Sequence, residues 1–317
     1  SVKIQAIEVA MKIYVAGHRG LVGSALVRAI EKENKDSWVG ASRDELNLFD
    51  RSKVFNFVKS EKPDAVIIAA ARVGGISANN NFPVEFLAEN LQIEMNLLEA
   101  CHAADIGKVL FLGSSCIYPR LAPQPIKEEY LLTGELEPTN EAYAISKIAG
   151  IKLVQAYRRQ YGREWISAMP TNLYGPGDNF DLESSHVLPA MIRRFHEAKK
   201  NQDSKINLWG TGTPRREFLH VDDLADACLF LLKNFNDDIS LNVGCGNDIT
   251  IRELAETIAN VVGYEGELVW DSSKPDGTPR KLMDSSRLNQ LGWNQSTSLR
   301  DGLKITYQDF LSSRDLK

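Results

Sequence analysis

The chain has 317 residues and a formal net charge of −5 at pH 7, with 43% hydrophobic and 25% charged residues. These values fit an enzyme of two lobes with a sizeable core. The negative charge argues against nucleic-acid binding, which needs a basic face. No apolar run approaches the roughly 18 residues of a membrane span, so we expect no membrane segment.

Cysteine usage and the first residues set further expectations. The four cysteines show no CxxC spacing, so we interpret them as reduced thiols of a cytoplasmic protein and predict no metal site. Residues 1–10 precede Met11, where the first clear strand begins, and we interpret them as a leader or tag.

A glycine turn follows the first β-forming run, residues 12–17, and precedes a helical pattern that extends to about residue 33. A strand, a glycine turn and a helix in this order place a phosphate-sized anion on the helix N-terminus. A tight turn without a ligand is the less favoured alternative. We expect a dinucleotide to contact the residues of this turn, which are Gly17, His18, Arg19, Gly20, Leu21, Val22 and Gly23.

The second strand is expected at residues 37–42 and ends at Arg43 and Asp44. This end lies about 20 residues past the glycines, where an acid holds the ribose 2′-hydroxyl of NAD and an arginine accommodates the 2′-phosphate of NADP. Arg43 and Arg19 together suit a phosphate dianion, whereas Asp44 argues for NAD. We predict NADP, with both Arg43 and Asp44 in the cofactor site.

The central strand is expected at residues 108–112, an apolar run that ends in a small polar turn with Ser114 and Cys116. In an open α/β sheet, ligands bind outside the carboxyl ends of the strands. We therefore expect catalysis at Ser114 and cofactor contacts from its neighbours Leu112, Gly113 and Ser115.

A helix is predicted over residues 141–161, after Asn140. Tyr143 and Lys147 are four residues apart and share one face of this helix. An ammonium beside a phenol favours the phenolate, so we expect the pKa of Tyr143 to be lowered toward the working range of an acid/base group. A surface tyrosine is the alternative for an isolated pair of this kind.

Strands alternate with helices throughout, which predicts an α/β fold: a Rossmann-type doubly wound parallel sheet with a smaller α/β substrate-binding lobe. A strand at residues 166–170 leads into a Gly/Pro turn and a polar stretch, 177–185, where we place the entry to the second lobe. We expect the cofactor lobe to comprise residues 11–172 and roughly 218–246, and the substrate lobe to comprise 173–217 and 247–317.

The glycine turn, Ser114 and Tyr143-x-x-x-Lys147, in this order, together with residues 216–223, resemble the extended short-chain dehydrogenases/reductases that act on nucleotide sugars. The resemblance spans about residues 11–310. It implies catalytic roles for Ser114, Tyr143 and Lys147 and an NADP cofactor, with further cofactor contacts at Pro170, Thr171, Asn172, Leu173 and His186. It also implies a homodimer through the long helix that opens at Pro83 and the helix that bears Tyr143.

Two residues depart from the common pattern of this family, Cys116 and His186. With the segments 114–119, 170–176, 185–189 and 274–281, they narrow the resemblance to members that act on a GDP-linked 4-keto-6-deoxymannose. Such members use NADPH, epimerise C3 and C5 and reduce the C4 ketone. The resemblance implies that Cys116 is the base and His186 the acid, and that the substrate contacts Arg194, Trp209, Arg216, Asp276 and Arg280.

Three alternatives stay open at this point. Cys116 can be a packed thiol, since free cysteine is often buried, and His186 a hydrogen-bonding residue at a helix entry. In that case the protein is a nucleotide-sugar 4-epimerase, or a 4-reductase without epimerisation. A redox-inert NADP-binding module is the distant alternative, because such proteins typically lose the tyrosine or the lysine.

Overall fold

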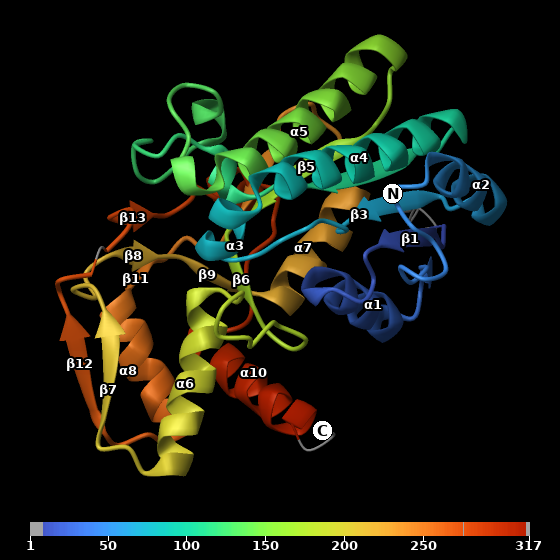
Figure 1. The fold of residues 1–317 in the computed structure, drawn as a ribbon. Coiled ribbons are helices and arrows are strands. Elements are labelled where there is room, and N and C mark those ends of the chain that lie inside the picture. Colours follow the sequence, from blue (N-terminus) through green and yellow to red (C-terminus); the bar gives the residue numbers. More distant parts are fainter. Residues whose placement is uncertain (1–8, 275, 315–317) are drawn as a thin grey trace, which may run out of the picture.

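The computed structural model describes residues 9–274 and 276–314. The interpretation of residues 1–10 as a leader therefore falls mostly outside the described residues. A six-stranded, all-parallel sheet occupies the centre of the molecule, in the order β10-β5-β4-β3-β1-β2 (Figure 1). Its strands are β1 (Lys12–Ala16), β2 (Ser37–Val39), β3 (Ala65–Ile68), β4 (Lys108–Leu112), β5 (Ile166–Pro170) and β10 (Leu241–Val243).

The sheet is covered on both faces because its strands are apolar on both sides. In β3, Val66 and Ile68 join one core cluster, and Ala65 and Ile67 join the other. Strands buried on both faces form near-continuous apolar runs, and successive side chains point to opposite faces. The first cluster includes residues of α2 (Arg51–Glu61), α4 (Pro83–Ala103) and α5 (Glu141–Tyr161), and the second includes residues of α1 (Leu21–Glu33) and α7 (Val221–Asn234). This arrangement confirms the predicted fold class.

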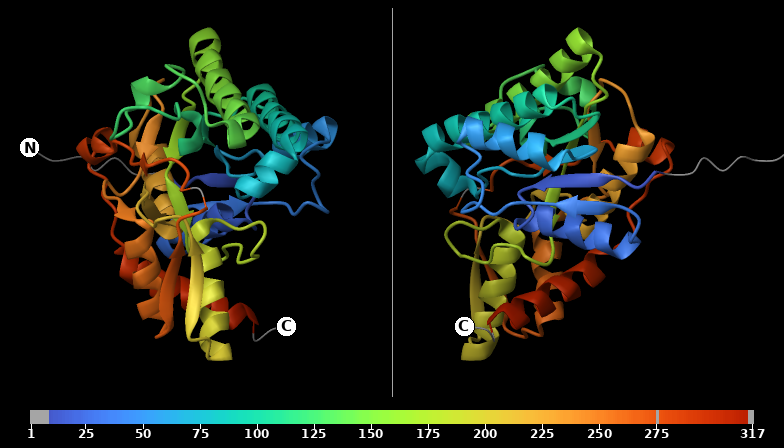
Figure 2. Two further views of the ribbon diagram at one scale, coloured as in Figure 1. Left: turned by 60° about the vertical axis from the view of Figure 1, so that its left-hand side comes forward. Right: turned by 90° about the vertical axis from the view of Figure 1, so that its right-hand side faces the viewer.

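A second group of elements has its own apolar core and lies beside the sheet (Figures 1 and 2). The core residues come mainly from three helices, including Phe195, Ile258 and Phe310. The elements are α6 (Val187–Asn201), α8 (Ile251–Val262) and α10 (Leu299–Arg314), the parallel pair β7 (Lys205–Trp209) and β12 (Glu267–Asp271), and a small sheet of β11 (Ile249–Thr250), β8 (Arg215–Arg216) and β13 (Arg280–Lys281).

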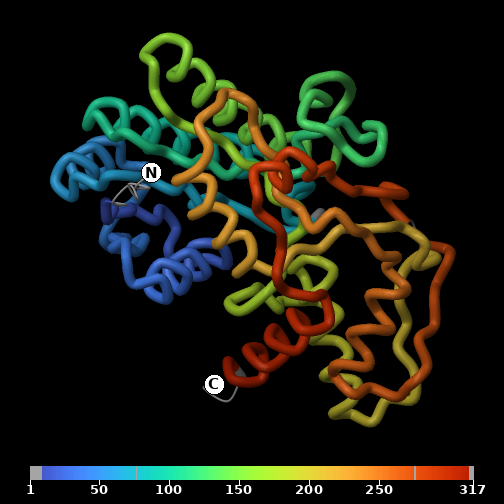
Figure 3. Tube along the Cα trace, turned by 180° about the vertical axis from the view of Figure 1, so that it is seen from behind, coloured from blue at the N-terminus to red at the C-terminus, as the bar shows by residue number. Residues whose placement is uncertain are grey.

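Short elements connect the two groups. After β13 the chain runs back along the sheet to α10 (Figure 3). The connecting strands are β6 (Asn172–Tyr174) and β9 (Phe218–His220), which pair with each other. The remaining short elements are α3 (Ile76–Asn81), α9 (Ser286–Gln290) and the 3₁₀ turns η1 (Ser115–Ile117), η2 (Glu128–Tyr130) and η3 (Pro138–Asn140). Within the described ranges, no helix is both long and apolar enough to cross a membrane.

Glu217, between β8 and β9, joins these connections. Its side chain is fully buried, and its two carboxyl oxygens accept hydrogen bonds from the backbone N–H groups of Gly246 (2.8 Å) and Met283 (3.1 Å). A Cβ at Gly244 would lie 2.3 Å from the Glu217 Oε1, so glycine allows the close approach. Asn172 donates a 2.8 Å side-chain hydrogen bond to the Glu217 carbonyl. One residue thus fixes segments that are far apart in the sequence.

We predict that Glu217→Ala lowers the free energy of unfolding by about 2–4 kcal/mol, because it leaves two buried N–H groups without an acceptor and opens a cavity. Denaturant titration at pH 7 measures this loss. The exposed Glu256 on α8 offers the matched control, and Glu256→Ala should change stability by less than about 0.5 kcal/mol. Equal stability of the two variants would contradict the role given to Glu217.

Candidate active site

The glycine turn has the geometry of a close backbone approach. Gly17 has φ of +86°, and a Cβ there would lie 2.8 Å from the backbone of Ala70. A Cβ at Gly23 would lie 2.0 Å from the Gly17 carbonyl oxygen. Gly20 is the N-cap of α1, and the described side chains provide no cap for this helix. The N-terminus of α1 is therefore open to an anion.

The end of β2 lies against this turn. His18 packs between the two, since a Cβ at Gly40 would lie 2.7 Å from its ring and Trp38 lies 5.6 Å from it, ring centre to ring centre. Burial, and then the neighbouring Arg19, lower the pKa of His18. Arg19, Arg43 and Asp44 are all exposed, so the two guanidinium groups predicted to bind a phosphate dianion are open to one.

Ser114 and Cys116 lie at the carboxyl end of β4, as expected. Gly113 donates a 2.8 Å backbone hydrogen bond to Ala168 of β5, which extends the pairing of the two strands. Ser114 then caps η1, and its hydroxyl accepts a 3.4 Å hydrogen bond from the backbone N–H of Cys116. Leu112 and Ser115 are buried here. The turn therefore leaves Ser114 partly exposed while the Cys116 thiol is enclosed.

Tyr143 and Lys147 share one face of α5, and the Lys147 Nζ lies 5.8 Å from the centre of the Tyr143 ring. The prediction of a lowered Tyr143 pKa is wrong: burial raises it, and the nearby Cys116 and Glu94 raise it further. The physical reason is that a phenolate loses its hydration in this enclosed position. In addition, Lys147 faces a carboxyl group, Glu94 of α4, at 3.2 Å.

Opposing effects act on the Cys116 thiol. Burial raises its pKa, while the Lys281 ammonium, the hydrogen bond with Ser114 and the Lys147 ammonium lower it. Lys281 comes from β13, which pairs with β8, and the sequence analysis did not identify it. The structure therefore brings together Ser114, Cys116, Tyr143 and Lys147.

His186 is positioned by a different group of elements from these four residues. It is the N-cap of α6 and belongs to the second group of elements. Among the hydrogen bonds, ion pairs and ring contacts of the described residues, none joins His186 to Ser114, Cys116, Tyr143 or Lys147. A backbone hydrogen bond of 3.1 Å from Gly75 to Ser184 holds the segment before His186 against the turn after β3.

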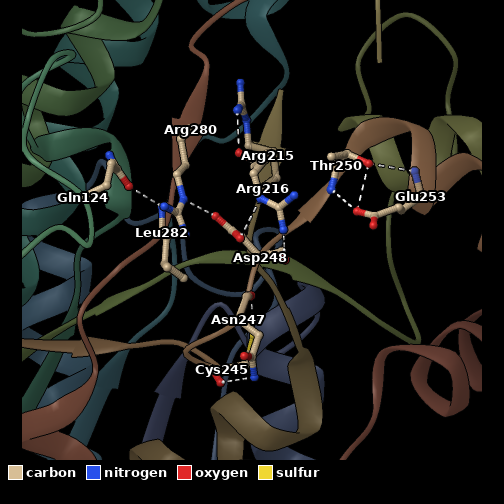
Figure 4. A network of polar contacts seen from close by, with 10 residues as sticks. All are labelled: Gln124, Arg215, Arg216, Cys245, Asn247, Asp248, Thr250, Glu253, Arg280 and Leu282. Atoms are coloured by element: carbon tan, nitrogen blue, oxygen red, sulfur yellow. Dashed lines mark hydrogen bonds and ion pairs between the residues drawn. The ribbon is translucent and has the colours of Figure 1, made fainter. Parts of the chain in front are cut away.

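The predicted substrate residues lie on the second group of elements. Arg215 of β8 and Arg280 of β13 both form ion pairs with Asp248, so two guanidinium groups share one carboxylate, with Arg216 beside them (Figure 4). Asp276 accepts two 2.7 Å hydrogen bonds from Thr211. Arg194 donates to the Asn207 carbonyl at 2.6 Å. Trp209 is 71% exposed, which is unusual for an indole unless a ligand covers it.

The sequence analysis did not identify two residues of the site, Glu94 and Lys281. For Glu94 the sequence carries a signal: Leu97, Leu98 and Cys101 follow at helical spacing, which puts the carboxyl group on the apolar face of its helix. For Lys281 the sequence carries none, because its approach to Cys116 depends on the pairing of β13 with β8.

The fold and the glycine turn are those of a dinucleotide-binding protein of the Rossmann class. The model of the NAD dependent epimerase/dehydratase family matches residues 13–244, and the chain belongs to this family. The family resemblance drawn from the motifs is confirmed.

Several relatives are similar to this chain over nearly its whole length. The chain is 59% identical to GDP-L-fucose synthase 1 of Arabidopsis thaliana, covering 95% of this chain and 94% of the relative. It is 56% identical to GDP-L-fucose synthase of Escherichia coli K12, covering 96% of this chain and 98% of the relative. A GDP-L-fucose synthetase from Naegleria fowleri, solved bound to NADP, superposes with a TM-score of 0.89 at 29% identity, over 96% and 95%. A GDP-6-OMe-4-keto-L-xylo-heptose reductase of C. jejuni superposes with a TM-score of 0.90 at 35% identity, covering 97% of this chain and 99% of that chain.

We predict that Arg43→Ala weakens NADPH binding about tenfold and NADH binding less than about twofold, because only NADPH carries the 2′-phosphate that a guanidinium pairs with. Fluorescence titration with each nucleotide measures both constants. Arg159→Ala removes an exposed charge near the end of α5 and should change neither. Equal weakening of both nucleotides would contradict this assignment.

Proposed function

We infer that this protein uses NADPH to convert GDP-4-dehydro-6-deoxy-D-mannose to GDP-L-fucose, by epimerisation at C3 and C5 and reduction of the C4 ketone. One observation carries the inference: a chain 54–59% identical to several GDP-L-fucose synthases has a thiol, Cys116, beside the Ser114, Tyr143 and Lys147 of a ketone-reducing site. A reductase alone has no use for that thiol.

The residues of the nucleotide site fit an NADP molecule. The glycine turn brings its backbone close to its neighbours and leaves the N-terminus of α1 without a side-chain cap, and the buried His18 Nδ1 has no hydrogen-bond partner among the described residues. The α1 N-terminus would hold the diphosphate and Arg43, with Arg19, the 2′-phosphate. When bound, NADPH supplies the hydride for C4. Further contacts would come from Leu112, Gly113, Ser115, Pro170, Thr171, Asn172, Leu173 and His186.

Epimerisation starts from the acidity that the C4 ketone gives to the hydrogens at C3 and C5. Ser114 and Tyr143 donate hydrogen bonds to the C4 oxygen and stabilise the enolate as its charge develops. Cys116 removes the proton, and His186 delivers one from the opposite face of the ring. Lys281 and Lys147 favour the thiolate that the base requires, against the cost of its burial.

Reduction uses the same tyrosine. Tyr143 would donate its proton to the C4 oxygen when the ketone is reduced. A raised pKa keeps this phenol protonated at neutral pH, which suits a proton donor. Lys147 would bind the nicotinamide ribose of the cofactor.

The second group of elements would hold the GDP-sugar. Arg194 and Arg216 suit the diphosphate, since guanidinium groups bind phosphate oxygens as a fork, and burial lowers the pKa of both. Trp209 would cover the nucleotide, and Asp276 and Arg280 would contact the sugar or the base.

A 4-reductase without epimerisation is the second candidate. The similar solved structures include a GDP-mannoheptose C4 reductase of Campylobacter jejuni, with a TM-score of 0.89 and 36% identity, solved with NADP bound. Mixing the protein with NADPH and the keto sugar separates the two candidates. Loss of the reduced-nicotinamide absorbance with GDP-L-fucose formed, identified by NMR, supports epimerisation, and oxidation that gives an unepimerised sugar supports the simple reductase.

The organisation of the protein follows the same proposal. The cofactor lobe comprises residues 11–172 and roughly 218–246, and the substrate lobe comprises 173–217 and 247–317.

The protein acts in the cytoplasm as a homodimer through α4 and α5, which lie side by side (Figure 1). Three exposed apolar side chains on these helices support the dimer: Val84 at 72%, Met95 at 46% and Ile145 at 42%.

We predict that Cys116→Ser loses epimerisation, by at least about 100-fold, because a hydroxyl is a far weaker base than a thiolate. Proton NMR in D₂O measures the exchange of hydrogen at C3 and C5. NADPH binding should stay within about twofold of wild type, which shows that the variant is folded. Full exchange in this variant would remove Cys116 from the chemistry.

We predict that Met95→Glu converts the dimer to a monomer at micromolar concentration, because the symmetric interface would then bury one new charge from each subunit. Light scattering measures the mass. Ile305→Glu, at an apolar residue of α10 that is 42% exposed, is the control and should leave the mass unchanged, because α10 packs on α8 and β9. A single-chain mass for the wild-type protein would contradict the dimer itself.

A further inference from the structure

A buried ion pair between Glu94 and Lys147 lies close to Tyr143. The proposed chemistry gives a role to Lys147 but none to Glu94. The Glu94 Oε1 of α4 lies 3.2 Å from the Lys147 Nζ of α5, and the two side chains are 1% and 3% exposed. Among the described residues, no hydrogen bond from another group reaches either carboxyl oxygen of Glu94. Lys147 is therefore the group that stabilises this carboxylate, and the carboxylate is the counter-charge of Lys147.

The surrounding residues are arranged to permit this contact. A Cβ at Gly150 would lie 2.9 Å from the Glu94 Oε2 and 2.3 Å from Phe111, so any larger residue would force the carboxyl group away from α5. The ring of Phe111 covers the Lys147 ammonium at 4.9 Å. Glu94, Gly150 and Phe111, from three different elements, thus fix the position of one ammonium group.

The contact places a titrating charge close to the catalytic phenol. Burial raises the pKa of Glu94 to about 7, and Lys147 opposes that rise. The carboxyl group therefore changes charge within the neutral range. Its charged form raises the pKa of Tyr143. The other ionisable groups that face this cluster are Cys116 of η1 and, through Cys116, Lys281 of β13.

We propose that Glu94 is a positioning residue: it holds the Lys147 ammonium in place and, through its own charge, governs how readily Tyr143 gives up its proton. Above neutral pH the carboxylate neutralises Lys147 and makes the phenol a weaker acid. Below neutral pH the carboxyl group is uncharged, the full ammonium charge acts on the phenol, and Tyr143 donates more readily. The kinetic part of this proposal depends on the role given to Tyr143 in the proposed function.

Glu94→Gln tests the proposal, because it keeps the shape of the side chain and an oxygen that accepts a hydrogen bond from Lys147, but removes the charge. The full chain, saturated with NADP⁺, is labelled with ¹³Cζ-tyrosine, and the Tyr143 signal is identified by its absence in Tyr143→Phe. In the wild-type protein we expect this signal to shift with a midpoint near pH 7, following Glu94. In Glu94→Gln the shift is expected to disappear.

The kinetics give the second readout. Between pH 6 and 8.5 the wild-type rate constant for ketone reduction, kcat, is expected to fall about threefold as Glu94 ionises, since a neighbouring charge shifts a pKa by about one unit or more and proton donation follows this shift in part. Glu94→Gln should match the wild type at pH 6 and show no such fall. Glu94→Asp, which restores the charge, should restore the fall.

Glu99→Gln is the matched control, because it makes the same change on the same helix but at a surface ion pair with Arg51. It should leave both the Tyr143 signal and the pH profile as in the wild type. If Glu94→Gln retains the shift near pH 7 and the wild-type pH profile, Glu94 has only a structural role and the proposal is wrong. If the wild-type protein does not oxidise NADPH with the keto sugar, the proposed function fails, and the tyrosine signal still decides the role of Glu94.

Discussion

The buried carboxylate of Glu217 is the interaction on which the site depends. It accepts backbone hydrogen bonds from residue 246, just after the edge strand β10, and from residue 283, just after β13. The backbone carbonyl of Glu217 also accepts a hydrogen bond from the side chain of Asn172, which lies just after β5. A buried carboxylate is costly unless each oxygen is satisfied, so these segments can only close around it in one arrangement. That arrangement sets β13 against β8 and so directs Lys281 toward Cys116.

Burial, rather than proximity of charge, is the dominant electrostatic effect in the site. It raises the pKa values of Tyr143, Cys116 and Glu94, and for Cys116 and Glu94 it outweighs the neighbouring lysines. A site built in this way keeps the Tyr143 phenol protonated at neutral pH. It suits chemistry in which one phenol first stabilises an enolate and then gives a proton to an alkoxide.

The parts of the site that could be predicted are those set by local sequence. The glycine spacing determines the turn before α1, and the spacing of Tyr143 and Lys147 determines their common face, because both depend on residues within one or two turns of helix. The apolar runs likewise indicated the parallel strands. The direction of the Tyr143 pKa could not be predicted, since spacing gives the separation of two groups but not their exposure to water.

The remaining residues of the site depend on tertiary contacts. Glu94 reaches Lys147 only because α4 and α5 pack together with Gly150 at their contact, and Arg280 pairs with Asp248 only because β11, β8 and β13 form one small sheet. A single glutamate or arginine in a sequence is usually a solvated surface charge. Only the folded chain shows which of them have a buried partner.

The order of the chain has a consequence for synthesis on the ribosome. The sheet begins with β1 but is completed by β10, and Glu217 receives its last backbone partner only from Met283. Domains usually fold as their sequences emerge, from the N-terminus onward. Here β5 gains its outer neighbour only when residues 241–243 have been made, after the whole stretch from β6 to α7, so the nascent chain must hold an open, apolar sheet edge until β10 has emerged.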